Sequence, residues 1–150
     1  MRTAFITLLA AAILAGAAYS QESSSTTMGA LHLESGRSIS VSRDIYGRNG
    51  DHFVTVCATK HGVPYVAVLN PHEAQQLAVL LETAWRRLAS TSPNSDLKFG
   101  GVSGIGVYAV NDTGRRFVSV VVHDGMTCAV IFYSYSDVQK LASYLRRAAQ

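Results

Sequence analysis

Leu31-His-Leu-Glu-Ser-Gly-Arg-Ser-Ile39-Ser-Val41 and Leu97-Lys-Phe-Gly-Gly-Val-Ser-Gly-Ile105-Gly-Val107 align at a constant offset of 66 residues. The correspondence continues through two further pairs of segments, Phe53-Val-Thr-Val56 with Phe117-Val-Ser-Val120 and Ala74–Ala78 with Val138–Ala142. The shared positions are mostly apolar residues and turn residues. The chain therefore repeats a packing unit and not a catalytic site.

Each repeat is predicted to hold four short strands followed by one helix. The alternation in Ile39-Ser-Val41-Ser is typical of a half-buried strand, and Asp124-Gly125 between two apolar runs indicates a hairpin turn. The expected strands are 30–34, 37–45, 52–59 and 63–69, then 97–101, 104–111, 115–123 and 126–133, with helices over 71–89 and 135–148. We expect one α+β domain over residues 30–150, built from repeats 30–90 and 96–150. Its antiparallel sheets are each backed by one C-terminal helix, in a pseudo-two-fold arrangement.

Both predicted helices begin with the same local chemistry. Asn70-Pro-His-Glu73 supplies an N-cap, a proline at the first helical position and an acid at the third, and Ser134-Tyr-Ser-Asp137 repeats the cap and the acid. Apolar residues then recur at spacings of three and four along each helix. One face of each helix is therefore expected to lie on a sheet.

The last two strands of the second repeat are apolar on both faces, which a single helix cannot cover. A two-residue turn at Asp124-Gly125 would place five residues on one face: Phe117, Val121, Cys128, Val130 and Phe132. By the repeat, Phe53 and Cys57 take the equivalent face, so we expect the two halves to pair or to pack on each other. A Cys57–Cys128 disulfide is one expectation, and two free buried cysteines are the alternative.

The first twenty residues match a bacterial-type signal peptide. Met1-Arg2 is a short basic start, residues 4–18 are almost wholly apolar, and Ala18-Tyr-Ser20 resembles a cleavage site. Residues 21–29 are rich in Ser and Thr and are expected to form a disordered spacer. The sequence thus predicts a periplasmic or secreted protein with no membrane span after cleavage.

Charge excludes few partners. Lys and Arg total 13 against 10 Asp and Glu, so loss of Arg2 with the leader leaves 12 against 10, a net charge of +2. Such a mild excess does not require nucleic acid or a membrane. Five basic residues near the predicted hairpin tips form a candidate binding rim: Arg43, Arg48, Lys60, Arg115 and Arg116. A simple solvated surface is the alternative.

The sequence offers no catalytic constellation. Asp112-Thr-Gly114 resembles the aspartic-protease triplet, but the corresponding loop of the first repeat lacks a second copy, and a hairpin turn explains it. The five histidines are scattered, whereas a metal site needs at least three converging ligands. No G-x-S-x-G elbow or phosphate-binding loop occurs. We therefore expect no enzyme activity, no metal and no cofactor.

The tandem ββββα order resembles that of plant whirly proteins and of the single-stranded-DNA-binding transcriptional coactivators. The resemblance spans nearly the whole predicted mature chain, but only as element order, and it carries over no binding residue. It implies sheets that present a surface to nucleic acid.

Three functions remain as hypotheses. The first is an exported, non-enzymatic binding protein, inhibitor-like or immunity-like, that recognises another protein or pairs as a homodimer. The second is a whirly-like binder of single-stranded nucleic acid. The third is a small-ligand carrier or enzyme with its site between the repeats, which requires a convergent polar pocket there.

Overall fold

The computed structural model describes residues 23–33, 36–47 and 49–150. The predicted signal peptide lies outside these residues. The first sheet is formed by β1 (Ser23–Leu33), β2 (Arg37–Tyr46), β3 (Asp51–Lys60) and β4 (Val63–Leu69), and α2 (Pro71–Arg87) with the short helix η1 (Leu88–Ser90) follows it. The second sheet is formed by β5 (Ser95–Val102), β6 (Ile105–Asp112), β7 (Arg115–Asp124) and β8 (Met126–Phe132), and α3 (Tyr135–Ala148) follows it. The predicted duplication of a ββββα unit is confirmed.

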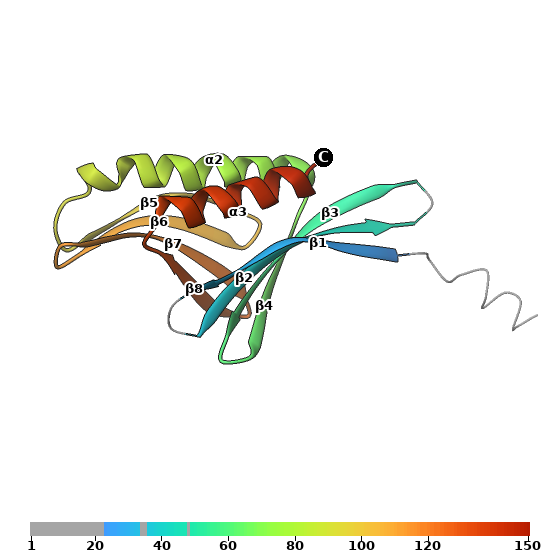
Figure 1. Cartoon of the computed structure of the whole chain (residues 1–150), viewed down its shortest axis with the longest axis horizontal. Coiled ribbons are helices and arrows are strands. Elements are labelled where there is room, and N and C mark those ends of the chain that lie inside the picture. The colour runs from blue at the N-terminus through green and yellow to red at the C-terminus, as the bar shows by residue number, and fades with distance from the viewer. Residues whose placement is uncertain (1–22, 34–35, 48) are drawn as a thin grey trace, which may run out of the picture.

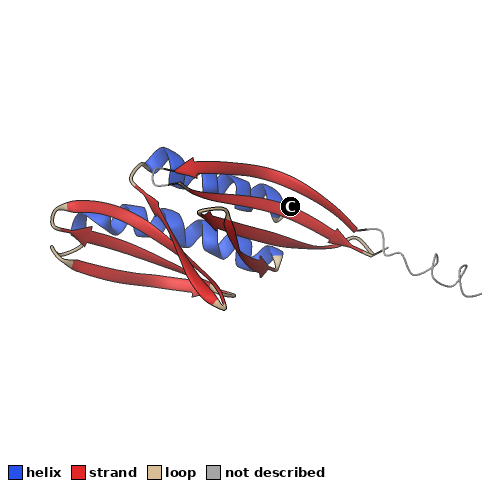
Figure 2. Cartoon of the chain, turned by 90° about the horizontal axis from the view of Figure 1, so that it is seen from below, coloured by secondary structure: helices blue, strands red, loops and turns tan. Residues whose placement is uncertain are grey.

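Both sheets are antiparallel meanders, with strand orders β1-β2-β3-β4 and β5-β6-β7-β8. The two helices lie side by side on one side of both sheets (Figure 1), and the view from below shows the strands in front of them (Figure 2). Each helix crosses to the sheet of the other repeat: α2 lies mainly against β5 and β6, and α3 lies mainly against β1 and β2. The repeats therefore share one hydrophobic core.

The helix starts agree with the sequence. The side chain of Asn70 accepts a hydrogen bond from the N–H of Glu73, and the Glu73 carboxylate accepts one from the N–H of Asn70, which completes a capping box. The hydroxyl of Ser134 accepts from the N–H of Asp137 at 3.1 Å. Both caps fix the point at which the chain leaves a sheet for a helix.

The first strand begins earlier than predicted. Residues 23–29, expected to lie in a disordered spacer, form the first part of β1 and pair with β2. Apolar periodicity missed this segment because its exposed side chains are Ser and Thr. The hydroxyl of Ser25 donates to the Asp44 carboxylate on the neighbouring strand, a partner that the sequence alone does not reveal.

The repeats align differently in their first strands. β1 and β5 each carry a bulge, directly before Gly29 and directly before Gly100, and these glycines pair with Val41 and Val107. Gly29 and Gly100 are therefore the structural equivalents, not Leu31 and Leu97. Consistent with this, Leu31 is buried whereas Leu97 is 51% exposed.

The β7–β8 hairpin also differs from the prediction. Asp124 pairs with Met126 across the single residue Gly125, so Val122 and not Val121 lies opposite Cys128. Cys128, Val130 and Phe132 consequently face the core, whereas Phe117 and Val121 lie on the face away from the helices. The packing expected over that outer face is only partial: Phe53 and Val68 on the outer face of the first sheet are 40% and 53% exposed.

Candidate functional site

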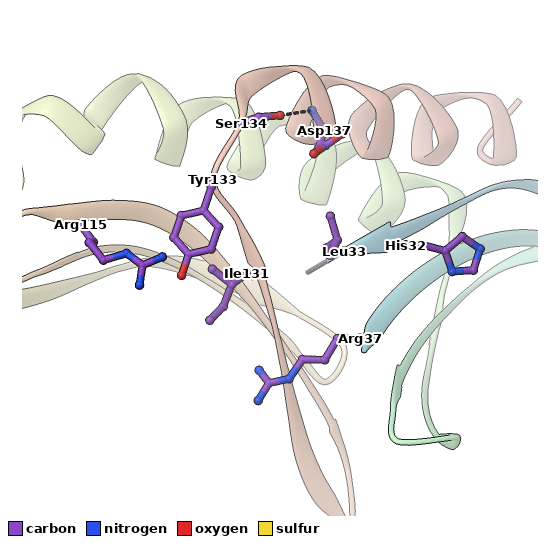
Figure 3. A pocket seen from close by; sticks show the side chains of 8 residues that line it. All are labelled: His32, Leu33, Arg37, Arg115, Ile131, Tyr133, Ser134 and Asp137. Carbon is purple, nitrogen blue, oxygen red and sulfur yellow. Dashed lines mark hydrogen bonds between the residues drawn. The ribbon is translucent and has the colours of Figure 1, made fainter. Parts of the chain in front are cut away.

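A pocket of about 790 Å³ opens between the repeats. Three residues come from the β1–β2 end of the first repeat, and the others come from β7, β8 and the start of α3 in the second (Figure 3). They are His32, Leu33, Arg37, Arg115, Ile131, Tyr133, Ser134 and Asp137. The pocket lies at the junction of the halves, where the small-ligand hypothesis places its site, and it is lined by both polar and apolar side chains.

Arg37 connects the two walls of the pocket. It begins β2, and its guanidinium donates a hydrogen bond to the main-chain oxygen of Ala129 on β8. β8 is the edge strand of the second sheet, so this bond satisfies a carbonyl that the sheet itself leaves open. Lys60 lies directly opposite Arg37 in the β2–β3 ladder and adds a second cation nearby.

β4, the edge strand of the first sheet, makes a similar contact with the second repeat. Val66 on β4 lies opposite Cys57, as Ala129 lies opposite Val121 in the second sheet. The main-chain N–H of Val66 donates to the carboxylate of Asp124 at 3.1 Å. In each edge strand, therefore, one main-chain group forms a hydrogen bond with a charged side chain of the other repeat.

The equivalent junction is bridged by a hydrogen bond, and a smaller pocket of about 530 Å³ lies beside it, between the end of β5 and the first turns of α2. Ser103 aligns with Arg37 in the repeat, and Glu73 aligns with Asp137. The Ser103 hydroxyl donates to the Glu73 carboxylate and joins the β5–β6 turn to the start of α2. This hydrogen bond, together with that from the Asn70 N–H, holds the pKa of Glu73 below its usual value. On the pocket side, Arg37 turns to Ala129 and Asp137 pairs with Lys140 at 3.4 Å.

One end of the pocket is an exposed aromatic and cationic group. The ring centroids of Tyr133 and Phe117 lie 5.4 Å apart in an edge-to-face arrangement, and the guanidinium carbon of Arg115 lies 5.0 Å from the Tyr133 centroid. Figure 3 shows Arg115, Tyr133 and Ile131 on the side of the second repeat and Arg37 reaching toward them from the first, while the ring of His32 is directed away from them. Tyr133 remains 45% exposed, so its ring is available to a ligand.

The structure does not bring the described residues of the predicted basic rim together in one place. Lys60 lies beside Arg37, and Arg115 lines the pocket. Arg116 is on the opposite face of β7, where it borders a shallow depression with Trp85 and Leu88. Arg43 is half-buried on β2. Arg48 lies outside the described residues.

The cysteines are both free in the structure, so the expected Cys57–Cys128 bridge is not formed. The one-residue change of register in the β7–β8 hairpin explains the difference. It turns Cys128 into the core, whereas Cys57 stays half-buried on the outer face of β3 with Phe53 and Thr55. Burial raises the pKa of the Cys128 thiol, against the opposing effects of Arg37 and Lys60.

Arg37, Ile131 and Tyr133 were not predicted as site residues. No local pattern distinguishes them, because the pocket forms only when the first repeat meets the edge of β8. The predicted position of β8 at the edge of its sheet was the one indication of a site, because the main chain of an edge strand is either covered by another segment or open to a partner. Among the described residues, no group of three or more His, Cys, Asp or Glu side chains is arranged to hold a metal ion.

Comparisons with family models, with curated proteins and with solved structures each give no match. No helix within the described part of the chain is long and apolar enough to span a membrane.

Proposed function

We propose that this chain is an exported, non-enzymatic binding protein that recognises another protein through the inter-repeat pocket and the adjoining Tyr133 face. The observation that carries the proposal is the exposed Tyr133 ring held between Phe117 and Arg115 at the mouth of the pocket. Tyr and Arg are enriched at the energetic centres of protein interfaces, because they bury large areas while keeping polar contacts. Export is proposed from residues 1–20, and the location is periplasmic or extracellular.

Site-specific photo-crosslinking in the protein's own cells tests this function. The photoreactive amino acid p-benzoylphenylalanine is placed at Tyr133 and, as the matched control, at the exposed Gln139 on α3. We expect a discrete protease-sensitive adduct from position 133 in the exported fraction and none from position 139. An adduct removed by nuclease, or equal adducts at both positions, would contradict protein recognition at this site.

Single-stranded nucleic-acid binding is the second candidate function. Its supporting observation is the duplicated phenylalanine: Phe53 and Phe117 each form an edge-to-face pair with a tyrosine on an outer sheet face, at centroid distances of 5.8 and 5.4 Å. Aromatic platforms beside cations bind bases in a sequence-tolerant manner. This function predicts affinity for an oligothymidine strand that falls steeply with salt. Absent or salt-insensitive binding would exclude it.

A further inference from the structure

The edge of β8 presents main-chain groups to the pocket. The Ala129 carbonyl points away from β7, because it accepts its hydrogen bond from Arg37 in the other sheet. Residues opposite each other in an antiparallel ladder alternate between hydrogen-bonded and non-hydrogen-bonded pairs. The Ile131–Ser119 pair is therefore of the same type as Ala129–Val121, and the N–H and C=O of Ile131 also point outward.

These groups of Ile131 are open to pairing. Among the described residues, no hydrogen bond outside the β7–β8 ladder involves the main chain of Ile131, and its side chain lines the pocket. Figure 3 shows the residue on the pocket wall between Arg37 and Tyr133. A donor and an acceptor pointing outward from an edge strand form a template for a further strand.

The edge is flanked by cations at both ends. Arg37 lies at Ala129, and Arg115 lies over Tyr133. Tyr133 lies four positions after Ala129, which is about 13 Å along a strand. Among the described lining residues, the one carboxylate is that of Asp137, which already has Lys140 as its partner. The charge of this edge therefore complements an acidic ligand.

The corresponding edge in the first sheet is less suited to a partner. Pro64 has no N–H to donate, and the N–H of Val66 is taken by Asp124. The Ser103–Glu73 hydrogen bond also joins the hairpin to the helix there. The β4 edge thus lacks a donor at position 64 and has the donor of Val66 taken, whereas the β8 edge keeps the N–H of Ile131 next to the exposed aromatic group.

We propose that an extended, acidic segment of a protein partner adds as a strand to the edge of β8, with its main chain on Ile131 and its carboxylates on Arg37 and Arg115. This inference rests on the proposed function and names the chemistry of the partner. In an extended segment, side chains two and four positions apart lie on one face, so acids at alternate positions reach both cations. The sugar-phosphate backbone of a DNA strand supplies phosphate acceptors but no donor for the Ile131 carbonyl, so it satisfies only part of this edge.

The test uses the mature chain and a fluorescent octapeptide of alternating glutamate and valine. Three comparison probes are the glutamine-valine peptide, the glutamate-valine peptide N-methylated at alternate residues, and an oligothymidine strand. We expect the parent peptide to bind measurably by fluorescence anisotropy, and N-methylation or glutamine substitution to weaken binding by about tenfold or more, because each removes one kind of contact.

Variants of the chain locate the site. Arg37→Gln and Arg115→Gln are expected to weaken the parent peptide by about fivefold or more, whereas Arg86→Gln on the exposed part of α2 leaves it unchanged. Far-UV circular dichroism and urea unfolding confirm that each variant is folded. The comparison with the N-methylated peptide uses the unaltered chain, so it does not depend on the folding of any variant. If the N-methylated peptide binds as tightly as the parent peptide, strand addition is overturned. If Arg86→Gln weakens the parent peptide as much as Arg37→Gln and Arg115→Gln do, the proposed site is overturned. Preference for oligothymidine would overturn the acidic peptide as ligand. If no acidic peptide binds while Tyr133 still crosslinks to a protein, this inference fails and the proposed function stands.

Discussion

Gly29 on β1 lies against the ring of Tyr144 on α3, so closely that a β-carbon at position 29 would come within 2.4 Å of the ring. The contact joins the first strand of one repeat to the last helix of the other. Arg147, one turn along the helix, donates to the main-chain oxygen of Met28 at the β1 bulge. The ring of Tyr144 therefore leaves no room for a β-carbon at position 29.

Gly29→Ala is expected to lower the free energy of unfolding by about 1–3 kcal/mol, because the added methyl group overpacks a fixed aromatic ring. Urea unfolding followed by circular dichroism measures the change. Ala30→Ser, at an exposed position of the same strand, is the control and is expected to have little effect. In the double variant with Tyr144→Leu, part of the loss should be recovered. Simple additivity of the two single changes would contradict a direct clash.

Phe132 and Phe117 separate the two faces of the second sheet. Phe132 is fully buried under the helices, so Phe132→Ala is expected to cost about 3–5 kcal/mol of unfolding free energy. Phe117 is half-buried on the outer face, and Phe117→Ala is expected to cost only about 1–2 kcal/mol. Equal costs, measured by chemical denaturation under the same conditions, would indicate that the outer face is covered as fully as the core.

The element boundaries could be predicted from sequence because they depend on local chemistry. The Asn70 and Ser134 caps and the glycines of the hairpin turns mark where strands and helices end. β1 could not be placed in full, since its N-terminal half is polar and is held by pairing with β2 and by the Ser25–Asp44 hydrogen bond. Periodicity detects apolar burial and not such partners.

The register of the β7–β8 hairpin and the pocket had to come from the structure. Asp124 ends β7 opposite Met126, and its carboxylate accepts a hydrogen bond from the N–H of Val66 in the other repeat. The local Asp-Gly turn pattern does not predict this contact between the repeats. The pocket joins Arg37 to the edge of β8, so neither side is recognisable until the two repeats are in place.

Glu82 and Arg146 link the two helices in a bidentate ion pair, with N–O distances of 2.8 and 2.7 Å. Because the pair is partly exposed, Glu82→Gln is expected to cost only about 0.5–1 kcal/mol at neutral pH. The hydrogen bond from Arg146 lowers the pKa of Glu82, so its contribution is present above the pKa of the unfolded chain and is lost as pH falls through the lower folded value.

The difference in unfolding free energy between the wild-type chain and Glu82→Gln should therefore shrink below about pH 4.3, the ordinary pKa of glutamate. Urea titrations at neutral and acidic pH measure it. A double-mutant cycle with Arg146→Gln is the control, because neither single change should matter once the partner is absent. A difference independent of pH would show that the carboxylate charge is not what Arg146 recognises.

The two thiols should differ in reactivity. Cys57 is half-buried, whereas Cys128 is 1% exposed and burial raises its thiol pKa, so Cys128 is both shielded from the reagent and disfavoured as a thiolate. We expect iodoacetamide to label Cys57 first in the folded chain, and to label Cys128 only after unfolding, with peptide mass spectrometry assigning each site. Cys57→Ser is the control and should leave a folded chain that is nearly inert to the reagent. Recovery of a Cys57–Cys128 disulfide from the exported protein would contradict the register that turns Cys128 toward the helices, because that register leaves the two thiols on different faces of their sheets.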